Sequence, residues 1–146
     1  MIPLALDADL VRRKMKLIME DMTDVQPLAA MDRDSFCASR INRYAAERIF
    51  ERMTGRMIDI NYHMLVAARG LPPSSYFESF IDAGKIGALP PDFARKIAVS
   101  AETRSRLTHE WDDVEAAEVH MKLQSFMADL PEYLRKIEEY LTSKGG

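Results

Sequence analysis

Apolar residues recur at intervals of three and four along nearly the whole chain, and this spacing constrains the fold more than any other feature. It places apolar side chains on one face of an α-helix. No run alternates with the period of two that a half-buried strand shows. The stripes comprise Val11, Met15, Ile18, Met22 and Val25, then Ala46, Ile49, Met53, Met57, Ile60 and Met64, then Phe93, Ile97, Ala101 and Leu107, and finally Val119, Leu123, Phe126, Leu130, Tyr133, Ile137 and Tyr140. The sequence therefore predicts an all-α fold.

Capping and helix-breaking residues set the expected ends of these helices. The first helix is expected from Asp7 or Asp9 to Pro27, and the second from about Asp34 to Ala68, where Gly70, Pro72 and Pro73 stop it. A short helix is expected from Ser75 to Gly84, and a further helix starts at Pro91. Asp112 with Glu115 is expected to cap the last helix, which Pro131 kinks or splits. We expect an antiparallel bundle of four longer helices plus one short helix. The absence of a repeat disfavours a solenoid fragment, so residues 1–146 are expected to form a single helical domain.

Composition narrows the class of protein and its environment. Of 146 residues, 47% are hydrophobic and 29% are charged, which is typical of a folded globular protein. No apolar run approaches the roughly 20 residues needed to cross a bilayer, so we expect no membrane association. Cys37 is the only cysteine, which fits a reducing cytoplasm. A net charge of −3 argues against non-specific coating of nucleic acid but leaves room for a local basic site.

The long second helix carries apolar residues on more than one side. Phe50, Ile58 and Leu65 lie off its main stripe. One bundle does not bury every face of such a helix, so we expect a homodimer. The ten methionines fall mostly on the stripes, where we interpret them as core or subunit packing rather than as a ligand surface.

The three histidines do not match a metal site. His63, His109 and His120 lack the glutamate three residues earlier that a carboxylate-bridged metal bundle requires. The sequence also lacks H-E-x-x-H, a cysteine cluster, a phosphate-binding glycine loop and a G-x-S-x-G elbow. We therefore expect neither a metal nor a cofactor.

The segment from Glu102 to Trp111 holds the candidate chemistry. Arg104 and His109 are about 140° apart on a continuous helix, so they converge only if the helix ends near His109 or a second subunit closes the site. Ser105 shares a face with His109 and is a candidate to orient its imidazole. The alternative is a salt-bridged helix end, because Arg106 stands four residues from both Glu102 and Glu110.

This segment resembles the R-x4-H-x-Y signature of the HepT-like ribonuclease toxins, all-α proteins of the HEPN superfamily. The sequence on both sides of this segment also resembles that of the family, from about Asp34 to Leu141. The similar stretches are residues 41–65, 70–76, 80–84 and 112–114. Two positions depart from the family pattern. Ser105 replaces the usual Asn or Asp, and Trp111 replaces the tyrosine that resembles a target for nucleotide transfer by the antitoxin. Indole has no phenolic oxygen, so no modification is expected at Trp111.

The resemblance implies a metal-independent endoribonuclease, the toxin of a pair whose antitoxin is a minimal nucleotidyltransferase. Arg104 would stabilise charge on the phosphate and His109 would act as general base or acid. Because the reaction needs both a base and an acid, a dimer would bring two His109 side chains together. Two alternatives stay open. One is a catalytically inactive module that binds RNA, nucleotide or protein; the other is a structural adaptor, in which Arg104 would be ion-paired and its groove closed.

Three further arginines lie on one face of the long helix, at positions 48, 52 and 56. Their like charges repel one another, so they need acidic neighbours or phosphate nearby. Glu47, Glu51, Asp59 or another helix are the candidate acidic neighbours, and the sequence leaves both explanations open.

Overall fold

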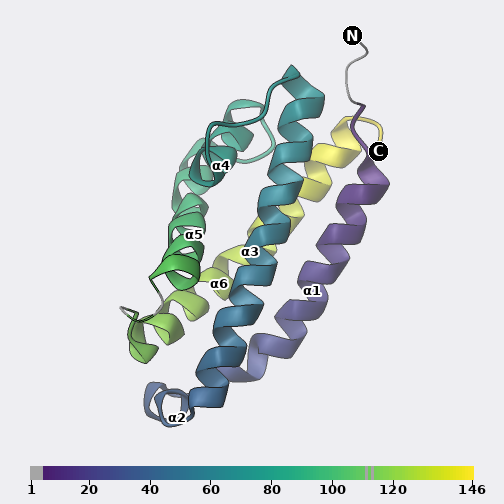
Figure 1. Cartoon of the computed structure of the whole chain (residues 1–146). Helices are drawn as coiled ribbons and strands as arrows, with labels where there is room; N and C mark the ends of the chain where they lie inside the picture. Colours follow the sequence, from purple (N-terminus) through teal and green to yellow (C-terminus); the bar gives the residue numbers. More distant parts are fainter. Residues whose placement is uncertain (1–4, 111, 113) are drawn as a thin grey trace.

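The computed structural model describes residues 5–110, 112 and 114–146, and within them the chain is helical, with no strand. The helices are α1 (Ala8–Ala30), α2 (Arg33–Cys37), α3 (Arg40–Arg69), α4 (Tyr76–Lys85), α5 (Pro91–His109) and α6 (Ala116–Ser143). Four long helices run along the molecule, each antiparallel to the long helix before it, with α2 and α4 at opposite ends (Figure 1). The predicted all-α bundle is confirmed, and α2 is an addition to it.

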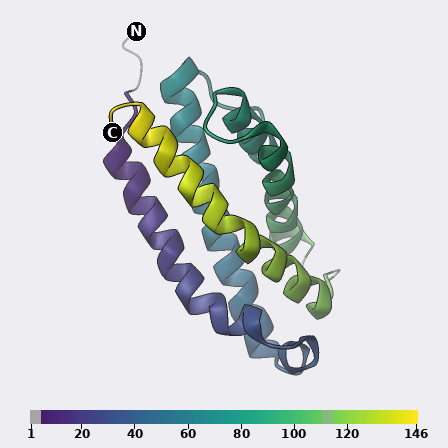
Figure 2. The ribbon, with the colours of Figure 1, turned by 180° about the vertical axis from the view of Figure 1, so that it is seen from behind.

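The predicted stripes form the core. Ile18, Met57 and Leu130 come from α1, α3 and α6, and all three are fully buried in one cluster. Seen from behind, α6 runs obliquely across the molecule between α1 and α5 and lies in front of α3 (Figure 2). None of the described helices combines the length and apolar character that crossing a bilayer requires.

Local capping residues fix most helix ends where the sequence predicted them. The side chains of Asp7 and Ser75 each accept a hydrogen bond, 3.0 Å long, from the backbone N–H three residues on. Gly70 ends α3 with a φ of 75°, a left-handed conformation that glycine adopts without strain. Pro91 is the first residue of α5, where its missing N–H costs nothing.

The limits of the first two predicted helices need correction. Pro27 does not end α1, which continues to Ala30, because a proline in the last turn removes only one intrahelical hydrogen bond. The long helix starts at Arg40 rather than near Asp34. The hydroxyl of Ser39 caps α3, and the separate helix α2 precedes it. At the end of the short helix, α4 extends one residue past Gly84.

The prediction for the start of α6 was wrong. Glu115 occupies the N-cap position itself, and no side-chain hydrogen bond caps α6. Pro131 does not split α6, which is continuous through it. Pro131 is exposed, so water can bind the backbone carbonyl that loses its intrahelical N–H donor, while the adjacent Leu130 and the nearby Tyr133 are fully buried and hold the helix against the core.

Candidate functional site

Arg104 of α5 lies against α3 and α4. Its guanidinium carbon is 5.5 Å from the ring centroid of Tyr76, within the range of a cation–π interaction. A Cβ atom at Gly55 would stand 3.8 Å from the Arg104 Nε, an ordinary contact distance, so Arg104 packs against α3 at Gly55. The Nε atom is buried and has no hydrogen-bond partner among the described residues. A buried donor of this kind costs free energy until an acceptor reaches it.

Arg104 lines an open cleft of about 600 Å³, formed by residues of α1, α3, α4 and α5. The lining residues are Lys14, Arg48, Glu51, Arg52, Gly55, Arg56, Ile58, Asp59, Tyr62, Tyr76 and Arg104. Five of these side chains are cationic and only two are carboxylates. The cleft therefore favours an anionic ligand, although the net charge of the chain is −3.

The three arginines on the face of α3 have acidic neighbours. Arg52 and Arg56 both contact the carboxylate of Asp21 on α1, at 3.4 and 2.6 Å. Arg48 lies 3.6 Å from Glu51 on its own helix. Of the two explanations that the sequence left open, acidic neighbours are present: Glu51 was one of the named candidates, and Asp21 is an acidic partner on another helix, which the sequence allowed without naming the residue. Asp59 pairs instead with Lys14, at 3.4 Å.

His109 is the last residue of α5, and its side chain is exposed. Because α5 is continuous from Arg104 to His109, the two side chains point about 140° apart. His109 is not among the residues that line the Arg104 cleft. Ser105 is also exposed, and no hydrogen bond joins it to His109 in the described part of the chain. One chain alone therefore does not bring the three predicted site residues into one pocket.

Arg106 and Arg104 differ in what they contact. Arg106 forms an ion pair with Glu118 of α6, which ties the end of α5 to the start of α6. Arg104 has no ion pair with any residue in the described ranges. Trp111, for which we expected no modification by a partner, lies outside the described residues.

The other two histidines have structural contacts. The His63 Nε2 atom accepts a hydrogen bond from the backbone N–H of Asp7, 2.8 Å long. His120 is buried; its Nε2 atom is 2.7 Å from the carbonyl oxygen of Met31. Its ring packs 4.9 Å from that of Phe36, which attaches α2 to α6. Within residues 5–110, 112 and 114–146, no group of three or more His, Cys, Asp and Glu side chains is placed to hold a metal ion.

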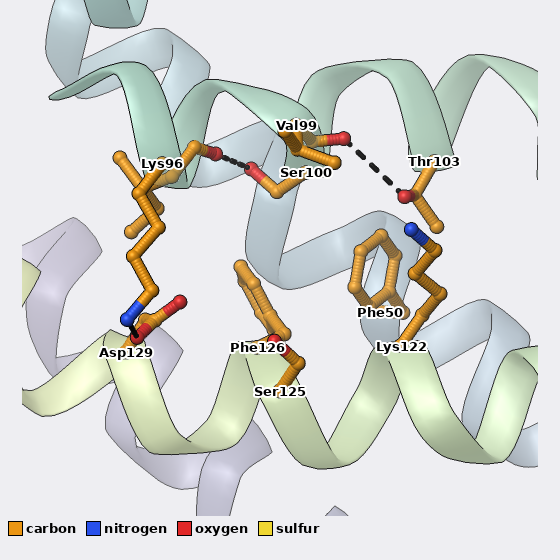
Figure 3. A pocket seen from close by; sticks show the side chains of 10 residues that line it. Phe50, Lys96, Val99, Ser100, Thr103, Lys122, Ser125, Phe126 and Asp129 are labelled. Atoms are coloured by element: carbon orange, nitrogen blue, oxygen red, sulfur yellow. Dashed lines mark hydrogen bonds and ion pairs between the residues drawn. The ribbon is translucent and has the colours of Figure 1, made fainter. Parts of the chain in front are cut away.

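A second cavity, of about 240 Å³, lies between α5 and α6 (Figure 3). Its polar side chains mostly bind one another or the backbone. Lys96 pairs with Asp129 at 2.9 Å, and the hydroxyl groups of Ser100 and Thr103 donate to backbone carbonyls of α5. The phenyl rings of Phe50 and Phe126 form part of the wall of this cavity. The groups suited to a phosphate are thus concentrated in the Arg104 cleft.

Sequence reasoning missed the residues that surround Arg104. Tyr76 and Tyr62 come from other helices and form an edge-to-face pair with ring centroids 6.0 Å apart. Gly55 gave a signal, because a glycine inside a long helix weakens it by roughly 1 kcal/mol relative to alanine. Packing was the expected compensation, but the sequence did not show that the packed group is Arg104.

Comparison with known proteins places these features in a family. The family model described as "Ribonuclease HepT-like" matches residues 9–137. The chain is 30% identical over 132 residues, 90% of each chain, to "tRNA nuclease HepT" of Aphanizomenon flos-aquae (strain 2012/KM1/D3). Its fold is similar to that of YutE, a cytosolic protein of unknown function from Bacillus subtilis, with a TM-score of 0.81, 14% identity, and coverage of 95% and 93% of the two chains. The chain belongs to the HepT-like ribonuclease family.

Proposed function

We propose that this protein is a metal-independent endoribonuclease whose catalytic residues are Arg104 and His109. The observation that carries the proposal is the state of Arg104. It lines an open cationic cleft, and among the described residues it has neither an ion-pair partner nor an acceptor for its buried Nε. A structural adaptor would have this arginine ion-paired and the groove closed. Family membership, and the tRNA nuclease among the relatives, support RNA as the substrate.

The proposed chemistry needs a base, an acid and a cation. His109 takes the proton from a ribose 2′-OH, whose oxygen attacks the adjacent phosphorus atom. Negative charge grows on the phosphate oxygens, and the planar guanidinium of Arg104 stabilises it. The bond from phosphorus to the 5′-oxygen breaks, and that oxygen receives a proton. The products are a 2′,3′-cyclic phosphate and a 5′-hydroxyl.

The acid and the base come from two copies of the chain in this proposal. Each chain has one motif histidine, exposed at the end of α5 and turned away from the Arg104 cleft. A two-fold dimer that brings the two ends of α5 together supplies both His109 side chains. It also allows Arg104 of one chain to approach His109 of the other.

We further propose that the protein is the toxin of a toxin–antitoxin pair, acts in the cytoplasm on transfer RNA, and is neutralised by a nucleotidyltransferase-type protein. Because Trp111 has no phenolic oxygen, the neutralisation is steric. Mass spectrometry after co-expression with the partner tests this. An unmodified chain is the expected result, and a nucleotide adduct near His109, for example on Thr108, would contradict it.

The deciding experiment is cleavage of transfer RNA by the purified protein in excess chelator, beside a His109→Ala variant prepared in the same way. We expect cleavage by the parent and cleavage slower by about 10²-fold or more by the variant. Activity that disappears with chelator and returns with magnesium would contradict metal independence. RNA binding without cleavage by the parent would favour the inactive binding module, which the departure at Ser105 keeps as the second candidate.

A further inference from the structure

The arginines of the cleft keep positive charge beyond what their carboxylates neutralise. Arg52 and Arg56 share one carboxylate, that of Asp21, which is only 5% exposed. A guanidinium has five N–H donors, so one carboxylate leaves several of the ten available to another acceptor. The side chains of Arg48 and Arg52 are 72% and 46% exposed, and both line the cleft.

These cations form a row that ends near Arg104. Positions 48, 52 and 56 are successive turns on one face of α3, about 6 Å apart along the helix axis. Gly55, against which Arg104 packs, is the neighbour of Arg56 in the sequence. Phosphates of an extended nucleic-acid strand repeat along a line in the same way, whereas a single small anion needs only one cationic group.

An aromatic surface lies beside this row. Tyr76 is 53% exposed although its ring already contacts the Arg104 guanidinium and forms an edge-to-face pair with Tyr62. Exposed aromatic rings beside a cationic groove are the arrangement with which proteins bind single strands, because bases stack on the rings while the cations follow the phosphates. A duplex does not fit this surface, since its bases are stacked on one another.

We propose that the Arg104 cleft is a binding groove for single-stranded RNA, in which Arg48 and Arg52 contact backbone phosphates and an unpaired base stacks on Tyr76. The inference rests on the proposed ribonuclease function and assigns the strand that leads to the reacting phosphate. Tyr76 also positions the Arg104 guanidinium, so the same ring orders both substrate and catalyst.

Fluorescence anisotropy of a short fluorescein-labelled oligouridine tests the groove. The titrations use protein carrying His109→Ala, so that the RNA stays intact. To this background are added Arg48→Gln, Arg52→Gln, Tyr76→Ala or Tyr76→Phe. The matched control is Arg135→Gln, which also removes an exposed arginine, here with two ion pairs, but lies on α6, outside the cleft.

We expect each arginine variant of the cleft to weaken binding and to lower the slope of log affinity against log salt by about 1. Tyr76→Ala should weaken binding about fivefold or more, because stacking on the ring is lost. Tyr76→Phe and Arg135→Gln should bind as tightly as the His109→Ala background. A duplex of the same length should not compete.

Four outcomes would overturn the inference: no binding of the oligouridine, unchanged binding in both arginine variants, equal binding of the duplex, or Tyr76→Phe behaving as Tyr76→Ala. Arg48→Gln removes only an exposed pair, so its binding result is independent of any loss of folding. Cleavage is measured in parallel with the parent and with the same groove variants made without His109→Ala. Groove binding without cleavage contradicts the proposed function alone, and cleavage that the groove variants leave unchanged contradicts this inference alone.

Discussion

Arg104 and His109 are five residues apart on α5 and have opposite surroundings. Arg104 is half-buried between the backbone of Gly55 and the ring of Tyr76, so its guanidinium has a fixed place. His109 is exposed at the end of the helix. A fixed cation suits the stabilisation of developing charge, and an exposed imidazole suits proton exchange with a substrate that a second subunit helps to hold.

Substitutions in the motif separate catalysis from stability. His109→Ala should lower cleavage by about 10²–10⁴-fold, the usual contribution of a general acid or base. Arg104→Ala should also be severely impaired, and Arg104→Lys should not restore full activity, because an ammonium group lacks the planar fork. Ser105→Asn should preserve or raise activity. Cleavage rates and melting temperatures are measured side by side. Alanine variants that cleave as fast as the parent would show that both residues merely end a helix.

Substitutions at Gly55 test whether the position of the Arg104 guanidinium matters for cleavage. Gly55→Ala should raise the free energy of unfolding by about 1 kcal/mol, because alanine is the better helix former. Its Cβ atom would lie 3.8 Å from the Arg104 Nε, an ordinary contact. Gly55→Leu should instead displace the guanidinium and lower cleavage. Denaturant unfolding and cleavage assays measure both effects. A leucine variant with full activity would show that the contact between Gly55 and Arg104 does not matter for cleavage.

At the scale of elements, the short helix α2 and the start of α3 depend on caps. Asp32 is the N-cap residue of α2, and its carboxylate accepts hydrogen bonds from the backbone N–H and the hydroxyl of Ser35, at 2.8 and 3.0 Å. Phe36 is the buried residue of α2 and packs on His120 of α6. This five-residue helix therefore depends on one cap and one buried ring.

The cap makes α2 sensitive to acid. The two hydrogen bonds from Ser35 lower the pKa of Asp32 below its ordinary value of 3.8. A lowered folded-state pKa contributes stability above the unfolded value, and this stability is lost as the pH falls through the folded value. Carboxyl-carbon NMR should show Asp32 titrating below pH 3.8. In Asp32→Asn, the amide should still cap α2 and remove this pH dependence. An ordinary or raised pKa at Asp32 would contradict the prediction.

At the scale of the whole molecule, the expected assembly is a homodimer with Arg104 and His109 of both chains at one cleft. The motivation is that the structure of one chain separates the two residues. Light scattering at micromolar concentration should give twice the mass of the chain, 16.7 kDa. A monomer, or a dimer with the two motifs on opposite outer faces, would remove the basis for a composite site.

The sequence alone predicted what depends on neighbours along one helix. Periodic apolar residues identified the long helices, and Asp7, Ser75, Gly70 and Pro91 marked their ends, because capping acts over three or four residues. The Arg104–His109 spacing also indicated the family. Pro27 did not end α1 and Pro131 did not split α6, because a helix tolerates one missing N–H where packing or solvent compensates.

Only the tertiary structure decided which groups line the cleft and which pair with its arginines. Asp21, Gly55, Tyr76 and Arg104 belong to four different helices, and no periodicity or cap relates them. Asp21 meets Arg56 across 35 positions of sequence, because α1 packs on α3. Such contacts depend on how whole helix faces pack, so they appear only once the bundle is assembled. The rotation along α5 places Arg104 and His109 on different sides of the helix. Only the neighbouring helices determine that the Arg104 side faces the cleft and the His109 side does not.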